Sequence, residues 1–187
     1  YFHVLAGHPQ DGMAAGEIFE LYADKTGNDY LGSIAIGFQG LAMILMGDMG
    51  KGMNLLQAMR RAAAEQDQKY LVCTFEYVVG NVFAQVTQGA TPLTFSLVLK
   101  NFGFLLRYVP FAAHRAKAHL NRAIDMGRLY GYDGLHALAC LDLGMLHKAK
   151  KKNDTARQLI SEAVQLFEKN QAAASLEQAR AALASLE

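Results

Sequence analysis

Apolar side chains recur along this chain at helical spacing, in blocks that short polar stretches separate. After the polar run KKKND, Ala156, Ile160 and Ala163 follow one another four and then three residues apart. This spacing places them on one face of a helix, and no strand-length alternation competes with it. The blocks predict helices over residues 11–24, 29–46, 50–66, 69–87, 112–129, 133–150, 153–169 and 172–186.

Glycines occur inside these predicted helices at a repeated register. Gly144 precedes Ala156, Ile160 and Ala163 by 12, 16 and 19 residues, and Gly40 precedes Gly52, Leu56 and Met59 by the same distances. Glycine costs about 1 kcal/mol relative to alanine in a helix interior. We interpret these glycines as points where two paired helices approach closely, because a side chain there would hold the backbones apart.

For a third glycine, Gly80, the second helix of the pair begins later in the sequence than in the other two pairs. Pro92 stands twelve residues after it, and the four-then-three spacing returns only at Ala116, Leu120 and Ala123. An insertion over residues 88–111 therefore separates the two helices of the middle pair. The whole predicted arrangement is one all-α domain, 1–187, with hairpins over about 29–66, 69–129 and 133–169 and a capping helix over 172–186.

The insertion contains the most apolar segment of the chain, LTFSLVLKNFGFLLRYVPF, from Leu93 to Phe111. Lys100, Asn101 and Arg107 interrupt it, so no uninterrupted apolar run is long enough for a transmembrane helix. We expect a buried helix over residues 93–107. A partner-binding surface, such as a homodimer through 93–111, and an interfacial segment remain as alternatives.

The composition of the chain limits the classes of function that it can have. The sequence is 52% hydrophobic and 19% charged, enough to bury a core, and its net charge of +1 gives no electrostatic case for nucleic acid. Cys73 and Cys140 lie in apolar helical contexts, which predicts buried reduced thiols and a cytoplasmic location. The chain begins with Tyr, which predicts a fragment of a longer protein.

The sequence offers little that resembles a catalytic or cofactor site. His3 and His8, like His114 and His119, are five residues apart, whereas two metal-binding histidines on a helix are typically four apart. We expect structural or surface roles for all six histidines and no metal or cofactor, and the sequence suggests no pairing of cysteine with histidine. The run GDMGKG at 47–52 lacks the phosphate-loop pattern, so we expect a turn between helices there.

The register around Gly144 resembles the tetratricopeptide repeat. Leu143, Gly144 and His147 in the first helix and Ala156, Ile160 and Ala163 in the second carry this resemblance. It implies a right-handed α-solenoid of helical hairpins whose first helices form a concave surface. The repeats are nearer forty residues than thirty-four, and the Trp and closing Pro of the family pattern are absent.

A narrower resemblance covers less than half of the chain. The segments HLNRAI, LDLGMLHKAK and LISEAVQLFE are similar to the C-terminal region of large bacterial signalling proteins. Those proteins join a class III adenylate or guanylate cyclase domain, a nucleoside-triphosphatase domain and a tetratricopeptide tail. The resemblance implies a non-catalytic regulatory module for protein–protein interaction. Neither catalytic domain lies in this sequence, so we expect no enzyme activity from it.

The tetratricopeptide resemblance also implies which residues face the groove. They are the residue three before each first-helix glycine and those one, four and five after it. Among them we expect Tyr77, Asn81, Gln85 and Lys148 to bind a protein or peptide partner, or the parent protein's own catalytic domains. The alternative function is a small-molecule sensor, with an apolar pocket closed by the insertion at 93–111.

Overall fold

The computed structural model describes residues 8–88 and 100–186, which form helices and no strand. The all-α prediction is therefore confirmed. The chain divides into two compact units, Tyr1–Phe75 with Leu93–Tyr108 and Glu76–Pro92 with Val109–Glu187. None of the helices within the described ranges is both long and apolar enough to cross a membrane.

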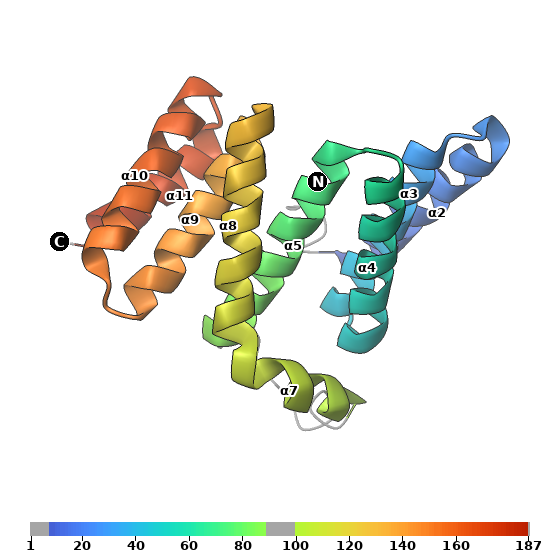
Figure 1. Cartoon of the computed structure of the whole chain (residues 1–187), viewed down its shortest axis with the longest axis horizontal. Helices are drawn as coiled ribbons and strands as arrows, with labels where there is room; N and C mark the ends of the chain where they lie inside the picture. The colour runs from blue at the N-terminus through green and yellow to red at the C-terminus, as the bar shows by residue number, and fades with distance from the viewer. Residues whose placement is uncertain (1–7, 89–99, 187) are drawn as a thin grey trace. The chain divides into compact units, whose positions relative to one another are not determined.

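The first unit begins with a run of antiparallel helices joined by tight turns (Figure 1). Asn28 begins α3, its side chain accepting hydrogen bonds from the backbone N–H groups of Tyr30 and Leu31. The GDMGKG segment is the expected turn, with Gly47 in the left-handed region at φ 82° and Asp48 as the N-cap of the next helix. The helices of this unit are α2 (Pro9–Thr26), α3 (Asp29–Leu45), α4 (Met49–Glu65), the first part of α5 (Lys69–Gln88) and α7 (Phe102–Tyr108).

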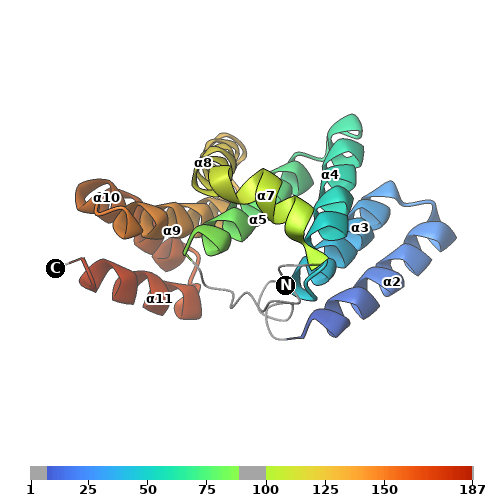
Figure 2. The same ribbon diagram turned by 90° about the horizontal axis from the view of Figure 1, so that it is seen from below.

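In the second unit the helices also pack in the order of the sequence. Helix α8 contacts α9, α9 contacts α10, and α10 contacts α11 (Figure 2). Ala179 on the last helix is buried, as is Leu186 beyond its end. This unit contains the remainder of α5, the short 3₁₀ helix η1 (Val109–Phe111), α8 (Ala112–Tyr130), α9 (Asp133–Ala149), α10 (Asn153–Lys169) and α11 (Ala173–Ala184).

The close approaches predicted at the glycines are confirmed. A Cβ atom on Gly144 would lie 2.6 Å from Cγ1 of Ile160, and one on Gly52 would lie 2.5 Å from the carbonyl oxygen of Gly40. In the middle pair a Cβ on Gly80 would lie 2.8 Å from Cγ of Leu120. Side chains at these positions would overlap their neighbours, so the glycines allow the paired helices to pack closely.

The insertion differs from the sequence prediction. Helix α7 has no buried residue, and Phe102 and Leu106 are 59% and 68% exposed, so the expected buried helix over 93–107 is wrong for its described part. A polar side chain, Asn101, is buried instead. It accepts a hydrogen bond from the Met49 N–H at 2.9 Å and donates one to the Gly47 carbonyl at 2.7 Å. The proposed sensor pocket also needs residues 93–99, which lie outside the described residues.

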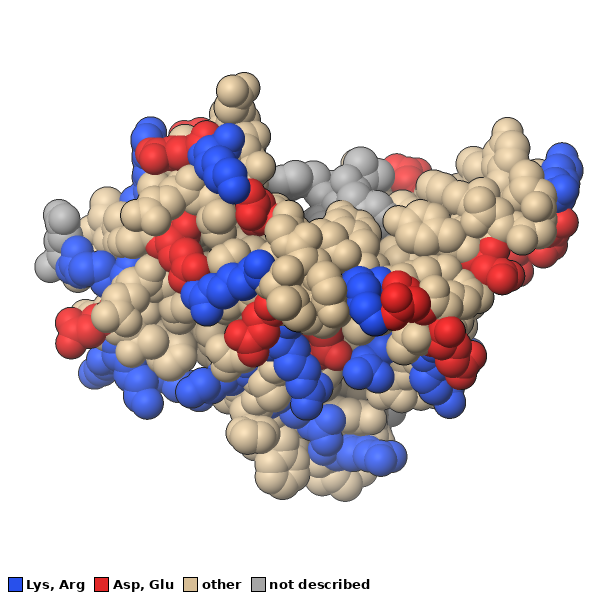
Figure 3. All heavy atoms as spheres, turned by 45° about the horizontal axis from the view of Figure 1, so that its top comes forward, with Lys and Arg blue, Asp and Glu red and all other residues tan. Residues whose placement is uncertain are grey.

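Charged side chains of both signs are mixed on the face shown in Figure 3. Ion pairs also join neighbouring helices, such as Lys169 with Asp133 at 2.6 Å. Exposed pairs of this kind contribute little to stability, because solvent and salt screen them. The mixture of signs agrees with the net charge of +1.

Candidate functional site

Three of the four residues expected in the groove lie together on α5. Tyr77, Asn81 and Gln85 are spaced four residues apart, so they occupy one face of the helix. The Gln85 amide donates to Oδ1 of Asn81 at 2.7 Å, and the Asn81 amide donates to Oδ2 of Asp142 on α9 at 2.7 Å. The Tyr77 hydroxyl is also hydrogen-bonded to Asp142. We call these four residues the polar row.

Exposure changes along the polar row. Tyr77 is buried at 6% exposure, Asn81 is half-buried, and Gln85 is exposed. Lys148, the fourth expected residue, is bonded to the Ser185 hydroxyl instead of joining the row. The Gln85 end of the row is therefore open to solvent, whereas the Tyr77 hydroxyl is hydrogen-bonded to Asp142 on α9.

Asp142 is an acid held in a poorly solvated position. Burial raises the pKa of its carboxyl group from 3.8 to about 6, although hydrogen bonds from Asn81 and Tyr77 act in the opposite direction. Burial, and secondarily the charge of Asp142, raises the pKa of Tyr77 well above its usual value. At neutral pH the Asp142 carboxylate is thus ionised, and it accepts hydrogen bonds from Asn81 and Tyr77 on α5.

A buried acid on the same helix makes a different contact. Glu76 is only 2% exposed, and one of its carboxylate oxygens lies 2.7 Å from Nδ1 of His119 and 3.7 Å from Nη1 of Arg122. Both partners come from α8. Because a buried carboxylate needs such partners, this contact joins the two helices of the middle pair across the site of the insertion.

A polar cleft of about 480 Å³ lies among α8, α9 and α10. Lys117, Lys152 and His147 line part of it, and neither lysine forms an ion pair within the described ranges. Nδ1 of His147 is buried and has no hydrogen-bond partner among the residues that the structure describes. Burial, and then the charges of Lys117 and Lys152, lowers the pKa of His147. Arg128 and Glu162 also line this cleft.

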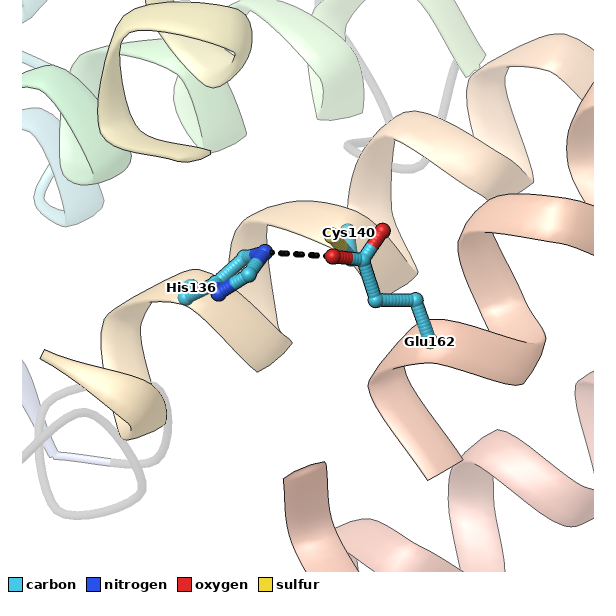
Figure 4. Close-up of side chains that lie close together, drawn as sticks. All are labelled: His136, Cys140 and Glu162. Carbon is cyan, nitrogen blue, oxygen red and sulfur yellow. Dashed lines mark ion pairs between the residues drawn. The ribbon is translucent and has the colours of Figure 1, made fainter. Parts of the chain in front are cut away.

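Glu162 connects the cleft to a buried cluster on α9. Nη2 of Arg128 donates to both carboxylate oxygens of Glu162 at 2.8 Å. Nε2 of His136 lies 2.9 Å from Oε1 of Glu162. Cys140 follows His136 by one helical turn, and the imidazole, thiol and carboxylate ligand atoms all lie within 4.8 Å of one another (Figure 4).

The cluster's protonation follows from its burial. Burial, and then the nearby Glu162, raises the pKa of the Cys140 thiol to about 12. Burial lowers the pKa of His136 despite the nearby carboxylate. For Glu162, burial alone would raise the pKa, but the hydrogen bonds and charge of Arg128 outweigh it and the pKa is lowered. The resting cluster therefore contains a thiol, an imidazole and an ionised carboxylate.

His136 and Cys140 are not among the site residues expected from the sequence. His136 and Cys140 have the four-residue helical spacing that the histidine pairs lack, so this half of the cluster was readable from the sequence. Glu162 comes from the next helix, 26 residues further on from His136, and only the hairpin packing brings it close. Cys73 and Cys140 are both buried, and no disulfide joins them, as expected.

No protein-family model matches the chain, and no curated protein matches it.

Proposed function

We propose that this chain is a non-catalytic interaction module that regulates a larger cytoplasmic signalling protein. In this proposal it is a right-handed α-solenoid of tetratricopeptide-like hairpins, from the C-terminal part of a bacterial nucleotide-cyclase-type protein. The glycine-centred packing of α3 on α4 and of α9 on α10 supports the repeat register. The neighbour-to-neighbour order of helix contacts is also typical of repeat proteins.

The polar row is the observation that carries this proposal. It joins α5 and α9, which are the first helices of successive hairpins in the proposed register, and it ends in the exposed amide of Gln85. Amides both donate and accept hydrogen bonds, so Gln85 and the accessible part of Asn81 suit an extended peptide backbone. The partner is therefore a peptide segment, either from another protein or from the parent's own catalytic domains.

A photo-crosslinking residue in place of Gln85 tests this function in cells that make the full-length protein. We expect it to capture a specific protein, or another segment of the parent chain. The captured segment should bind the purified chain, and the double variant Asn81→Ala, Gln85→Ala should bind it at least tenfold more weakly, a loss of about 1.4 kcal/mol or more. Isothermal titration calorimetry measures both affinities.

Gln158 on α10 provides the matched control, because it is also an exposed glutamine but lies on the second helix of its hairpin. A crosslinker at 158 should not capture the same segment, and Gln158→Ala should leave its affinity unchanged. Equal capture from both positions, or equal affinity of the double variant and the wild type, would contradict a partner site on α5.

A further inference from the structure

We propose that His136, Cys140 and Glu162 form a binding site for a zinc-class divalent metal ion. Their ligand atoms converge from two helices, with His136 and Cys140 on successive turns of α9 and Glu162 reaching across from α10 (Figure 4). The proposal is independent of partner binding at the polar row.

The three side chains already lie in contact around the Glu162 carboxylate, which is hydrogen-bonded to both His136 and Cys140. His136 is 5% exposed, and its Nε2 is directed at this carboxylate (Figure 4). A metal ion placed among the three ligand atoms would replace these contacts and accept a lone pair from Nε2.

The separations suit a small ion after modest side-chain movement. Bonds of about 2.0–2.3 Å to a tetrahedral Zn²⁺ place neighbouring ligand atoms about 3.3–3.8 Å apart. The ligand atoms here lie within 4.8 Å of one another, and Nε2 of His136 is 2.9 Å from Oε1 of Glu162. Shifts of an ångström or less therefore make room for the ion.

The donor set selects the class of metal. Imidazole nitrogen and thiolate sulfur favour Zn²⁺ and similar borderline ions, whereas Mg²⁺ and Ca²⁺ prefer sites made of oxygen. As the metal–sulfur bond forms, Cys140 loses its thiol proton to water, and the resulting thiolate donates its electron pair to the ion. Three protein ligands leave the fourth tetrahedral position for water or a solute.

The surroundings hold the ligands in place and provide access. A Cβ atom on Gly127 of α8 would lie 2.7 Å from Cβ of His136, so the α8 backbone packs directly against that residue. Arg128 donates to both oxygens of Glu162, and each oxygen has a second lone pair with which to bind a metal. Because Glu162 also lines the polar cleft, an ion can reach it from solvent.

Cys73 shows that burial of a cysteine does not by itself produce such a cluster. It is as fully buried as Cys140, with both side chains at 0% exposure. Yet in the part of the chain that the structure describes, the group of potential ligands contains Cys140 and not Cys73. This makes Cys73 the matched control for an experiment on the thiol.

Cobalt titration of the reduced, metal-free full chain tests the proposal. Wild type and Cys73→Ser should each bind one equivalent of Co²⁺, with a thiolate-to-cobalt charge-transfer band and the intense visible bands of four-coordinate cobalt. Cys140→Ser should lack the charge-transfer band. One equivalent of Zn²⁺ should remove the band from the wild type and raise its melting temperature.

Variants of His136 and Glu162 test whether the imidazole nitrogen and the carboxylate bind the metal. His136→Ala and Glu162→Gln should bind Co²⁺ more than about tenfold more weakly, whereas the exposed His114→Ala should bind it like the wild type. Circular dichroism of each metal-free variant verifies that it is folded. If a variant is unfolded, X-ray absorption of the zinc-loaded wild type gives the same answer, because the site predicts one sulfur among light-atom ligands.

The proposal is overturned if the wild type gives no charge-transfer band at saturating Co²⁺, or if the band survives in Cys140→Ser. Loss of the charge-transfer band in Cys73→Ser would identify Cys73, and not Cys140, as the thiolate ligand. An absorption spectrum without sulfur in the first coordination sphere would exclude Cys140 as a ligand.

Discussion

At the scale of single residues, Asp142 is the acid of the polar row, and burial opposes its ionisation. Its acceptors are satisfied by Asn81 and Tyr77, both neutral donors. The net result is still a pKa raised from 3.8 to about 6, so the hydrogen bonds do not fully replace the lost hydration. Ionisation of Asp142 therefore destabilises the folded protein through burial, even though it strengthens the hydrogen bonds from Asn81 and Tyr77.

The sign of its pH dependence follows directly. Since the folded pKa exceeds the unfolded one, the contribution of Asp142 to stability is fully present below pH 3.8 and is lost as the pH rises through about 6. A shift of this size corresponds to at most about 3 kcal/mol. We expect Asp142→Asn, which cannot ionise, to be more stable than the wild type at pH 8 by about 1–2 kcal/mol.

Urea unfolding of both proteins between pH 4 and pH 8 measures this difference, which should shrink or reverse towards pH 4. The exposed Asp125→Asn on α8 is the control, because it removes the same charge outside the polar row. A free-energy difference between Asp142→Asn and the wild type that stays constant from pH 4 to pH 8 would show that the carboxyl group titrates normally.

At the scale of helices, the glycine contacts determine how closely the two helices of a hairpin pack. Gly144 lies against Ile160 and near the backbone oxygen of Ala156, and all three residues are buried. Gly134 lies near the start of the same helix, and a Cβ there would meet nothing within 4 Å. The same substitution at the two positions therefore separates helix propensity from packing.

We expect Gly144→Ala to destabilise the protein by about 1–3 kcal/mol, because overlap with Ile160 exceeds the gain in helix propensity. Gly134→Ala should be neutral or stabilise it by up to about 1 kcal/mol. Gly144→Leu should be worse than Gly144→Ala, because its larger side chain must also be accommodated. Thermal and urea unfolding give all three values; a Gly144→Leu protein with wild-type stability would contradict the hairpin register.

The helices were the most predictable part of the molecule, since the glycine register and the polar turns mark them directly. The bounds predicted for the last hairpin, 133–150 and 153–169, differ by one residue at most from α9 and α10. Asp142 was missed because its role depends on the packing of α9 against α5, not on its spacing from Gly144. The exposure of α7 was missed because apolar composition alone does not reveal that Asn101 is the buried anchor.

At the scale of the whole molecule, the chain forms two compact units, and helix α5 contributes to both because the division falls between Phe75 and Glu76. The insertion is divided as well, between Tyr108 and Val109. Its helix α7 belongs to the first unit and exposes Phe102 and Leu106, which are four residues apart and share one face. Exposed apolar side chains of this kind favour self-association.

If this chain forms a homodimer through 93–111, the double variant Phe102→Glu, Leu106→Glu should be monomeric. Light scattering should then give the variant 20.4 kDa and the wild type about twice that mass. The control, Arg107→Glu, adds negative charge to α7 without removing apolar surface and should associate more strongly than the double variant. A wild type of 20.4 kDa at all accessible concentrations would exclude this dimer.

The two buried cysteines lie in different units, Cys73 in the first and Cys140 in the second. A thiol reagent can modify either one only after its surroundings open, so each modification rate measures the opening equilibrium of its own unit when reclosing is fast. Each unit thus contains one cysteine whose modification rate reports how often that unit opens. Equal rates at every urea concentration would mean that the units open together, whereas separate rates would rank them by local stability.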